Sequence, residues 1–460
     1  MPDPPSSSTT SRAHRLVKDA LLGLAKIRNE NGNWIDSESE SEAVSQAYKR
    51  LNALSCFLAT KPYPAIWNFV AQETRSWLRQ DLEKVMIFIQ EEGFNPIPYA
   101  GVISPGLVFF DFACDVLSFC GDLADAFAED AQLMDKAKEC SIKAFEELTG
   151  EGHFYRDESG CAWAPTPRFE DRRKAPAYNT YFTSLFSLAI YRGLNQPLVK
   201  EWWGEERCSR GLTLAREACR YLLAAANNGQ IMPTTDIDPT NVALFEKLIY
   251  TCWGLRALLT CWEWLDASQQ NMVKPVAQGF LQLMESSWSE KAFDHKAILP
   301  NGDESTYEHR TSLGGLITTL AELKRRNISD LQLSLHNIAY KHYRLLLDYR
   351  DAATHLWYSE MDEVASMPYI INDLLLFGDA FGDLDKDLNI PIPELKTQVE
   401  DILKKSNIIE NIAEIITRGL STMADSSETE GILKKLATEE EPPRGAVPAK
   451  PPRKRKKKKK

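Results

Sequence analysis

The stretch Asn227–Trp264, NNGQIMPTTDIDPTNVALFEKLIYTCWGLRALLTCWEW, contains the unit from which the fold can be predicted. A turn at Gly229 leads into a short polar loop that carries Asp236 and Asp238. The long segment that follows is apolar on nearly all sides, as expected of a buried helix. The same order of turn, polar loop and apolar helix recurs about six times along the chain, which predicts a repeat architecture.

The repeats are regularly spaced. The apolar helices are predicted to begin near Glu42, Pro105, Tyr178, Pro239, Thr306 and Pro368, at intervals of 61 to 73 residues. Proline is favoured in the first turn of a helix, where its missing N–H removes no intrahelical bond. Between these helices lie amphipathic segments with charge on one face, at about 67–91, 129–148, 209–226, 267–287 and 329–349.

An apolar inner layer covered by an amphipathic outer layer predicts an all-α fold, an (α/α)6 toroid of six helical hairpins. The predicted organisation is a disordered N-terminus at 1–12, the toroid at 13–385, a C-terminal helical extension at 386–437 and a disordered basic tail at 438–460. In such a ring the loops that precede the inner helices gather at one end. We expect the chemistry of the protein there.

The composition argues against a membrane-spanning, secreted or zinc-binding protein. The sequence has no run of 18 uncharged apolar residues, and its N-terminus lacks the apolar segment of a signal peptide. The nine cysteines are scattered without a Cys-x-x-Cys pair, which favours reduced, buried thiols over disulfides or a zinc site. We therefore expect a soluble cytoplasmic protein without a bound metal ion or cofactor.

The charge is unevenly distributed. The formal net charge is −11, yet residues 444–460 carry ten basic side chains and no acidic one. The run Arg453–Lys460 suits a nuclear localisation signal, a contact with nucleic acid or a contact with an anionic membrane surface. It equally suits a solvated tail that touches the acidic body of the protein itself.

The segment Ile27–Leu54, IRNENGNWIDSESESEAVSQAYKRLNAL, resembles a repeat of the terpenoid-cyclase and protein-prenyltransferase superfamily. In that repeat a polar turn ending Gly-x-Trp precedes an acidic loop and an inner helix. The resemblance covers residues 16 to about 385, and the other repeats lack the Gln of the family pattern. It implies the same helical toroid.

Class II terpene cyclases of that superfamily carry Asp-x-Asp-Asp followed by Thr, where a loop enters an inner helix. Residues 234–241, TTDIDPTN, are similar, with Asp236 and Asp238 as the first and middle acids, Thr240 as the Thr, and Pro239 in place of the last Asp. The resemblance implies that Asp238 protonates a linear isoprenoid substrate with Asp236 as its partner. Two carboxylates in one cavity do not both ionise easily, so one stays an acid. Mg²⁺ is expected only if the substrate is a diphosphate.

Aromatic side chains of the inner helices are candidates to stabilise a carbocation, each by up to ~2 kcal/mol when desolvated. The predicted substrate-binding residues are Phe110, Tyr181, Phe186, Phe245 and Trp253, together with Glu308 in an acidic loop at the same mouth.

Other interpretations stay open at this point. Asp-x-Asp-Pro-Thr is also an ordinary helix entry, with Asp238 as the N-cap and Pro239 as the first helical residue. The toroid also suits a non-catalytic scaffold that binds a protein or nucleic acid through its acidic face and basic tail. An (α/α)6 glycoside hydrolase needs two carboxylates across the mouth, which Asp238 with Glu308 or Glu360 can supply. Residues 372–374 resemble the metal-binding motif of class I terpene synthases only faintly, without the hydroxyl and acid that complete it.

Overall fold

The computed structural model of the chain describes residues 11–34, 43–74, 76–94, 105–150, 154–164, 179–242, 244–287, 294–298, 304–308, 315–328, 332–348, 350–351, 354–357 and 367–382. The chain divides into two compact units, Met1–Leu388 and Asn389–Lys460. All described residues belong to the first unit. The predicted C-terminal extension and basic tail lie outside the described residues.

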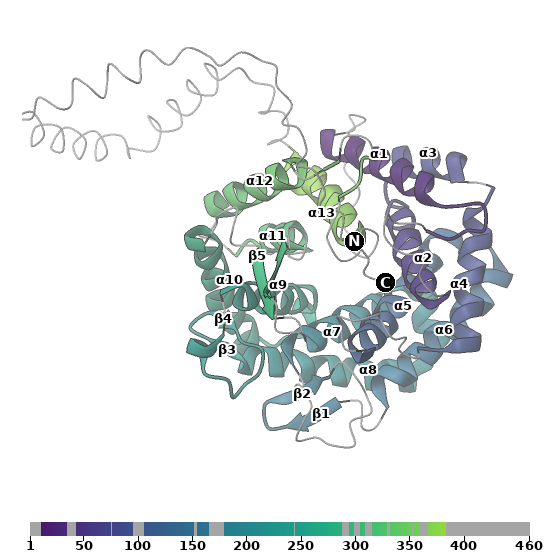
Figure 1. Cartoon of the computed structure of the whole chain (residues 1–460). Helices are drawn as coiled ribbons and strands as arrows, with labels where there is room; N and C mark the ends of the chain where they lie inside the picture. Colours follow the sequence, from purple (N-terminus) through teal and green to yellow (C-terminus); the bar gives the residue numbers. More distant parts are fainter. Residues whose placement is uncertain are drawn as a thin grey trace, which may run out of the picture. The chain divides into compact units, whose positions relative to one another are not determined.

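Six helices form a closed inner ring. They are α2 (Ala43–Leu58), α5 (Pro105–Phe127), α7 (Thr180–Asn195), α9 (Leu244–Thr260), α11 (Leu316–Arg325) and α13 (Met367–Ala380). Each of them packs against the next in this order, and α13 packs against α2, which closes the ring (Figure 1).

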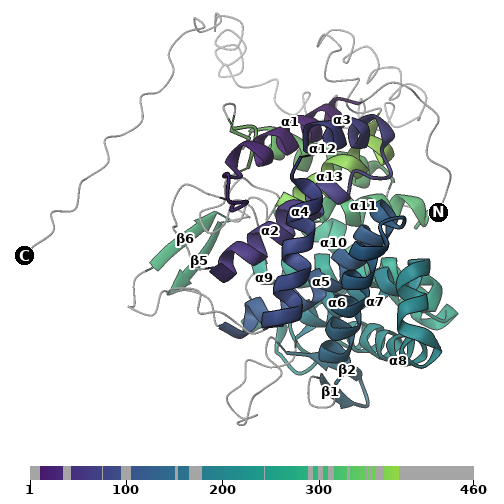
Figure 2. The ribbon, with the colours of Figure 1, turned by 90° about the vertical axis from the view of Figure 1, so that its right-hand side faces the viewer.

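A second layer of helices covers the first. It consists of α1 (Arg12–Ile27), α3 (Pro64–Thr74), α4 (Leu78–Glu92), α6 (Ala131–Thr149), α8 (Pro197–Ala224), α10 (Ala267–Ser287) and α12 (Gln332–Asp348). Helix α4 packs on α2, α6 on α5, α8 on α7, α10 on α9, α12 on α11 and α1 on α13. From the side, α4 and α6 run next to each other along the outside of the ring (Figure 2). This is the predicted all-α toroid, and its fold class is confirmed.

Short hairpins and 3-10 helices connect the layers. Strands β1 (Phe154–Asp157) and β2 (Gly160–Trp163) pair antiparallel, as do β3 (Ala226–Asn227) with β4 (Gln230–Ile231) and β5 (Asp294–Ile298) with β6 (Glu304–Glu308). The 3-10 helices are η1 (Pro239–Asn241) and η2 (Trp262–Trp264). The β3–β4 turn has positive φ at Asn228 (48°) and Gly229 (75°), the conformation that an Asn-Gly pair favours in a two-residue hairpin.

Four predicted segments differ from the structure. Helix α9 begins at Leu244 rather than near Pro239, where the chain forms η1, and α8 begins at Pro197 rather than at about 209. The fifth inner helix begins at Leu316 rather than near Thr306, because residues 304–308 pair as strand β6. Gly315, with φ of 89°, immediately precedes the helix. The outer segment predicted at 67–91 is two helices, α3 and α4, since Trp77 adopts a non-helical conformation with φ of −135°.

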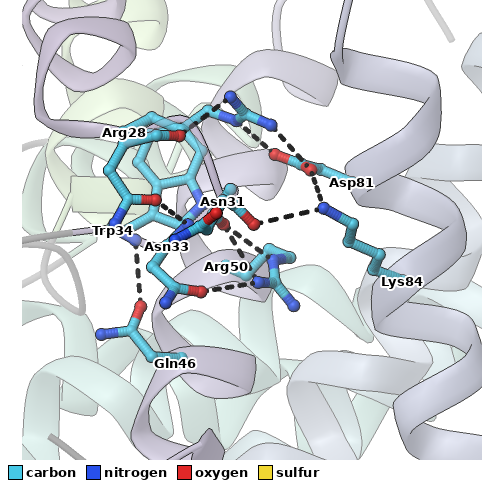
Figure 3. A network of polar contacts seen from close by, with 10 residues as sticks. Arg28, Asn31, Asn33, Trp34, Gln46, Arg50, Asp81 and Lys84 are labelled. Atoms are coloured by element: carbon cyan, nitrogen blue, oxygen red, sulfur yellow. Dashed lines mark hydrogen bonds and ion pairs between the residues drawn. The ribbon is translucent and has the colours of Figure 1, made fainter.

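A polar network fixes the first helical hairpin (Figure 3). Arg28 and Trp34 form a β-bridge across the turn after α1. The backbone N–H of Trp34 donates to Oε1 of Gln46 on α2 at 2.9 Å. Arg28 donates through Nε and Nη2 to the two oxygens of Asp81 on α4, whose side chain is fully buried. The turn is therefore tied to both the inner and the outer layer.

Candidate active site

Polar and aromatic side chains converge where the inner helices face one another. We call this group the inner-ring cluster. Its members are Tyr48 of α2, Asp111 and Asp115 of α5, Tyr181 of α7, Trp253 and Arg256 of α9, and Tyr369 and Asp373 of α13. They come from five helices that are distant in sequence, and the closed ring brings them together.

Asp111 and Asp115 are the acidic pair of the cluster. They are four residues apart on α5, so they share one helix face with Cβ atoms about 5–6 Å apart. Burial raises the pKa of Asp115 to about 7. Burial, and secondly the charge of Asp115, raises the pKa of Asp111 well above its ordinary value. Burial therefore favours the protonated form of both acids, and Asp115 titrates near neutral pH.

Among the described residues, no basic side chain is recorded as an ion-pair partner of Asp111 or Asp115. Oδ1 of Asp111 is buried and has no hydrogen-bond partner in the part of the chain that the structure describes. No cation contributes to the shift of the pKa of Asp115, for which burial is the cause. By surface area both residues are half-buried, although Oδ1 of Asp111 itself is buried. A buried carboxyl oxygen without a partner and strongly shifted pKa values are characteristic of functional sites.

Three tyrosines surround the acids. Tyr48, Tyr181 and Tyr369 have pKa values raised well above 10, in each case mainly through burial, with further contributions from the charges of Asp111 and Asp115. Their phenols are therefore protonated at any physiological pH. All three are half-buried, and each hydroxyl can donate or accept a hydrogen bond.

Trp253 connects the tyrosines across the cluster. Its ring lies edge to face with Tyr181 at 5.4 Å and with Tyr369 at 5.3 Å between centroids. Edge-to-face packing is a preferred arrangement of aromatic pairs. The guanidinium of Arg256 lies over the same ring, with Cζ 5.1 Å from its centroid. Trp253 and the two tyrosines therefore form an aromatic group, and the guanidinium of Arg256 packs against it.

Asp373 holds the start of α11. Its Oδ1 accepts hydrogen bonds from the N–H of Thr318 at 2.9 Å and from the hydroxyl of Thr318 at 2.8 Å, and its Oδ2 accepts from the N–H of Ile317 at 3.3 Å. These bonds replace the cap that Gly315 cannot supply, because glycine has no side chain. Burial nevertheless raises the pKa of Asp373 to about 6.

The predicted acid pair lies elsewhere. Asp238 is exposed, and its Oδ1 accepts hydrogen bonds from the N–H of Thr240 at 2.9 Å and from the hydroxyl of Thr240 at 2.8 Å. These bonds lower the pKa of Asp238, which is the opposite of what a proton donor needs. Asp236 is also exposed. Asp238 therefore caps the N-terminus of η1, which is the second interpretation given for this motif above.

Of the six predicted substrate-binding residues, two belong to the inner-ring cluster and two have side chains that the structure does not describe. Tyr181 and Trp253 are members of the inner-ring cluster. Phe245 lies in α9 and Glu308 in β6, and their side chains are outside what the structure describes.

The other two predicted aromatics are packed in the core. Phe110 is 3% exposed and meets Phe182 edge to face at 5.5 Å. Phe186 is fully buried and stacks on Trp163 at 3.7 Å. Both have the contacts expected of residues that stabilise the packing between helices.

Five members of the inner-ring cluster were not predicted from the sequence: Tyr48, Asp111, Asp115, Arg256 and Tyr369. The predicted acids lie in loops, whereas these residues lie on inner helices. A signal was present, because two acids four residues apart interrupt an otherwise apolar run, FFDFACDVL at 109–117. Acids are seldom placed on a helix that is apolar on all sides unless a partner or a ligand meets them.

No known family model matches the sequence, and neither does any curated protein. Solved structures are similar in fold at low identity. One, from Klebsiella pneumoniae subsp. pneumoniae, is described as a possible member of the GH105 family, with 11% identity over 82% of this chain and 96% of its own, at a TM-score of 0.46. A UGL variant with dGlcA-Glc-Rha-Glc has 10% identity over 79% and 95%, at 0.49. A polysaccharide lyase has 12% identity over 83% and 99%, at 0.43.

The predicted terpene cyclase activity is wrong. None of the three structures named above is described as a terpene cyclase; they are described as a possible member of the GH105 family, a UGL variant and a polysaccharide lyase. The positions of Asp236 and Asp238 agree with this correction, because neither lies in the inner-ring cluster.

The structure also bears on metal binding and on membrane-spanning helices, and it leaves two predictions untested. Within the described residues, no three or more His, Cys, Asp or Glu side chains are grouped to hold a metal ion. None of the described helices is long and apolar enough to cross a membrane. Contacts of Arg453–Lys460 with nucleic acid or an anionic membrane, and the non-catalytic scaffold, stay predictions.

Proposed function

We propose that the protein is a carbohydrate-active enzyme that cleaves a glycosidic bond, with Asp111 and Asp115 as its acid and base. The observation that carries the proposal is the acidic pair itself. Two carboxyl groups lie one helical turn apart with raised pKa values, and Oδ1 of Asp111 has no partner among the described residues.

The difference between the two acids assigns their roles. Asp111, whose protonated form is favoured by burial and by the charge of Asp115, protonates the glycosidic oxygen as the bond from that oxygen to the anomeric carbon breaks. Asp115, which ionises near pH 7, accepts a proton from the water that attacks the anomeric carbon. Environments that separate the pKa values of two carboxyl groups are the usual basis of such acid–base pairs.

The remaining side chains favour a sugar over an apolar substrate. The hydroxyl groups of a sugar can pair with the phenols of Tyr48, Tyr181 and Tyr369, which are half-buried. An isoprenoid would cover the same phenols and Asp111 without offering them hydrogen bonds. Each unpaired buried polar group then costs about 1–3 kcal/mol.

The test is cleavage of a panel of glycosides by the full-length protein. The panel contains α- and β-linked disaccharides of neutral sugars and of uronic acids, and new reducing ends are measured. We expect at least one member to be cleaved, with the rate lowered about 100-fold or more in Asp115→Asn. Asp236→Asn is the matched control, because the same substitution is made at an exposed site. Cleavage that is unchanged in Asp115→Asn contradicts the proposal, as does the absence of cleavage across the panel.

A further inference from the structure

We propose that Asn52 of α2, together with Tyr48, holds the water molecule that attacks the anomeric carbon in the cleavage reaction. This inference rests on the proposed function and adds a residue that orients the attacking water. Asn52 is 4% exposed, and its Nδ2 is buried without a hydrogen-bond partner among the described residues.

The position of Asn52 is unusual for a polar side chain. It lies on the inner helix α2 between Leu51 and Ala53, both of which are fully buried. A buried amide donor that is left without a partner destabilises the fold, whereas an apolar side chain of similar size would not. A small polar ligand therefore accounts for Asn52 better than packing between helices does.

Asn52 and Tyr48 lie on the same side of α2. They are four residues apart, which makes their side chains neighbours on one helix face. Burial raises the pKa of Tyr48, and the amide of Asn52 lies close enough to the phenol to offset part of that rise. Nδ2 of Asn52 nevertheless forms no hydrogen bond. Two polar groups that lie close without bonding directly are suited to a bridging water molecule.

Tyr48 brings this position next to the acidic pair. Its ring packs on Phe112 of α5, with 6.0 Å between centroids, and Phe112 directly follows Asp111. Next to burial, the charge of Asp115 is the largest cause of the raised pKa of Tyr48. A water molecule between Tyr48 and Asn52 is therefore close to the carboxylate that we propose as the base.

Such a water molecule can use each of its hydrogen-bonding groups. It donates one hydrogen to Asp115 and the other to the phenol oxygen of Tyr48, and it accepts the N–H of Asn52. Three hydrogen bonds are usual for a buried water. The remaining lone pair forms the bond to the anomeric carbon as one proton of the water passes to Asp115. The bond from that carbon to the glycosidic oxygen breaks, and Asp111 protonates the leaving oxygen.

The experiment measures how the protein divides a substrate between water and an added alcohol. The full-length protein cleaves the panel glycoside that wild type cleaves fastest, in aqueous methanol, and mass spectrometry separates the free sugar from the methyl glycoside. In Asn52→Leu we expect kcat to fall about tenfold and KM to stay within about twofold, since one hydrogen bond to the attacking water is lost. The ratio of methyl glycoside to free sugar should rise about fivefold or more, because Leu disfavours water more than methanol.

The product ratio separates positioning of the water from a structural role. A variant that only loosens the fold lowers both products equally and leaves their ratio unchanged. Tyr48→Phe keeps the ring against Phe112 and removes the phenol oxygen, so it should raise the ratio as well, and it serves as the test if Asn52→Leu does not fold. Asn195→Leu is the matched control, because Asn195 is exposed at the end of the inner helix α7 and bonds the carbonyl of Tyr191. It should leave the ratio unchanged.

An unchanged product ratio in Asn52→Leu and Tyr48→Phe, with cleavage by wild type intact, overturns the inference and leaves the proposed function standing. Absence of cleavage by wild type is a failure of the proposed function, and the attacking role of the water fails with it. The water site itself is tested without turnover by a crystal structure of the unliganded protein. A water within about 3.2 Å of both Nδ2 of Asn52 and the phenol oxygen of Tyr48 supports the site. A direct bond between the two side chains, or the absence of that water, overturns it.

Discussion

Asp111 and Asp115 lie one turn apart on α5, where burial raises the pKa of both, that of Asp115 to about 7, and the charge of Asp115 further raises the pKa of Asp111. The toroid accounts for this relationship. Inner helices supply an apolar surrounding that disfavours charge, and the ring places three protonated tyrosines around the pair. Acid–base chemistry near neutral pH is the reaction class that such a pair serves.

The first prediction concerns the pH dependence of cleavage. Asp115 acts only when ionised, so kcat/KM should rise with pH through about 7. Asp111 acts only when protonated, and its pKa is raised, so the rate should fall again once the pH is high enough to ionise Asp111. The measurement is kcat/KM across pH 5 to 10. A maximum at pH 5 followed by a steady decline toward pH 7 would refute the assignment.

The second prediction concerns stability. The pKa of Asp115 in the folded protein, about 7, is above its ordinary value, so the unfolded chain ionises first. Folding therefore loses stability as pH rises from about 4 to about 7, and this loss is absent in Asp115→Asn. At pH 8 the variant should be more stable than wild type by roughly 2–3 kcal/mol, allowing for partial exposure, and at pH 4 about equal. Denaturant unfolding at both pH values tests this, with Asp236→Asn as the control that should show no such difference.

Much of the fold could be predicted from the sequence. The regular spacing of the apolar helices predicted the closed double ring. Proline favours the first turn of a helix, which correctly predicted the start of α5 at Pro105 and of α13 beside Pro368. The misplaced start of α11 has a tertiary cause. Its cap is Asp373, which is more than fifty residues further along the chain, and no local pattern reveals such a cap.

The site was harder to predict for a related reason. The Asp-x-Asp motif at 236–238 is conspicuous in sequence but serves as a helix entry. Asp111 and Tyr369 become neighbours only when α13 closes the ring against α2, beside α5. The pKa values that suggest a function therefore depend on packing between distant helices, which one sequence does not specify residue by residue.

The third prediction compares the stability contributed by two helix caps: Asp373, which caps a helix distant in sequence, and Asp238, which caps its own turn. Asp373→Ala removes three hydrogen bonds at the buried start of α11 and should lower the free energy of unfolding by about 2 kcal/mol. Asp238→Ala removes two bonds at an exposed 3-10 turn and should cost less than about 0.5 kcal/mol. Chemical denaturation of both variants provides the measurement. Equal losses would show that Asp373 does not act as a buried cap.

The fourth prediction concerns the network of the first hairpin. Asp81→Asn leaves Arg28 without its bidentate carboxylate at a buried site, which should cost about 3 kcal/mol of stability. The pair Glu322–Arg325 is the contrast, because the Arg325 side chain is 47% exposed. Arg325→Gln should cost less than about 1 kcal/mol. Thermal melting of both variants can be compared, and a larger loss in Arg325→Gln would argue against the structural role of the network.

The most direct test of the acid–base pair compares Asp111→Asn and Asp115→Asn on two glycosides of the same sugar. One is a disaccharide, whose leaving oxygen needs a proton, and the other is a nitrophenyl glycoside, whose leaving group does not. The account predicts that Asp111→Asn loses about 100-fold or more on the disaccharide and much less on the nitrophenyl glycoside, while Asp115→Asn loses activity on both. Equal losses of Asp111→Asn on both substrates, or no loss on either, would contradict the account.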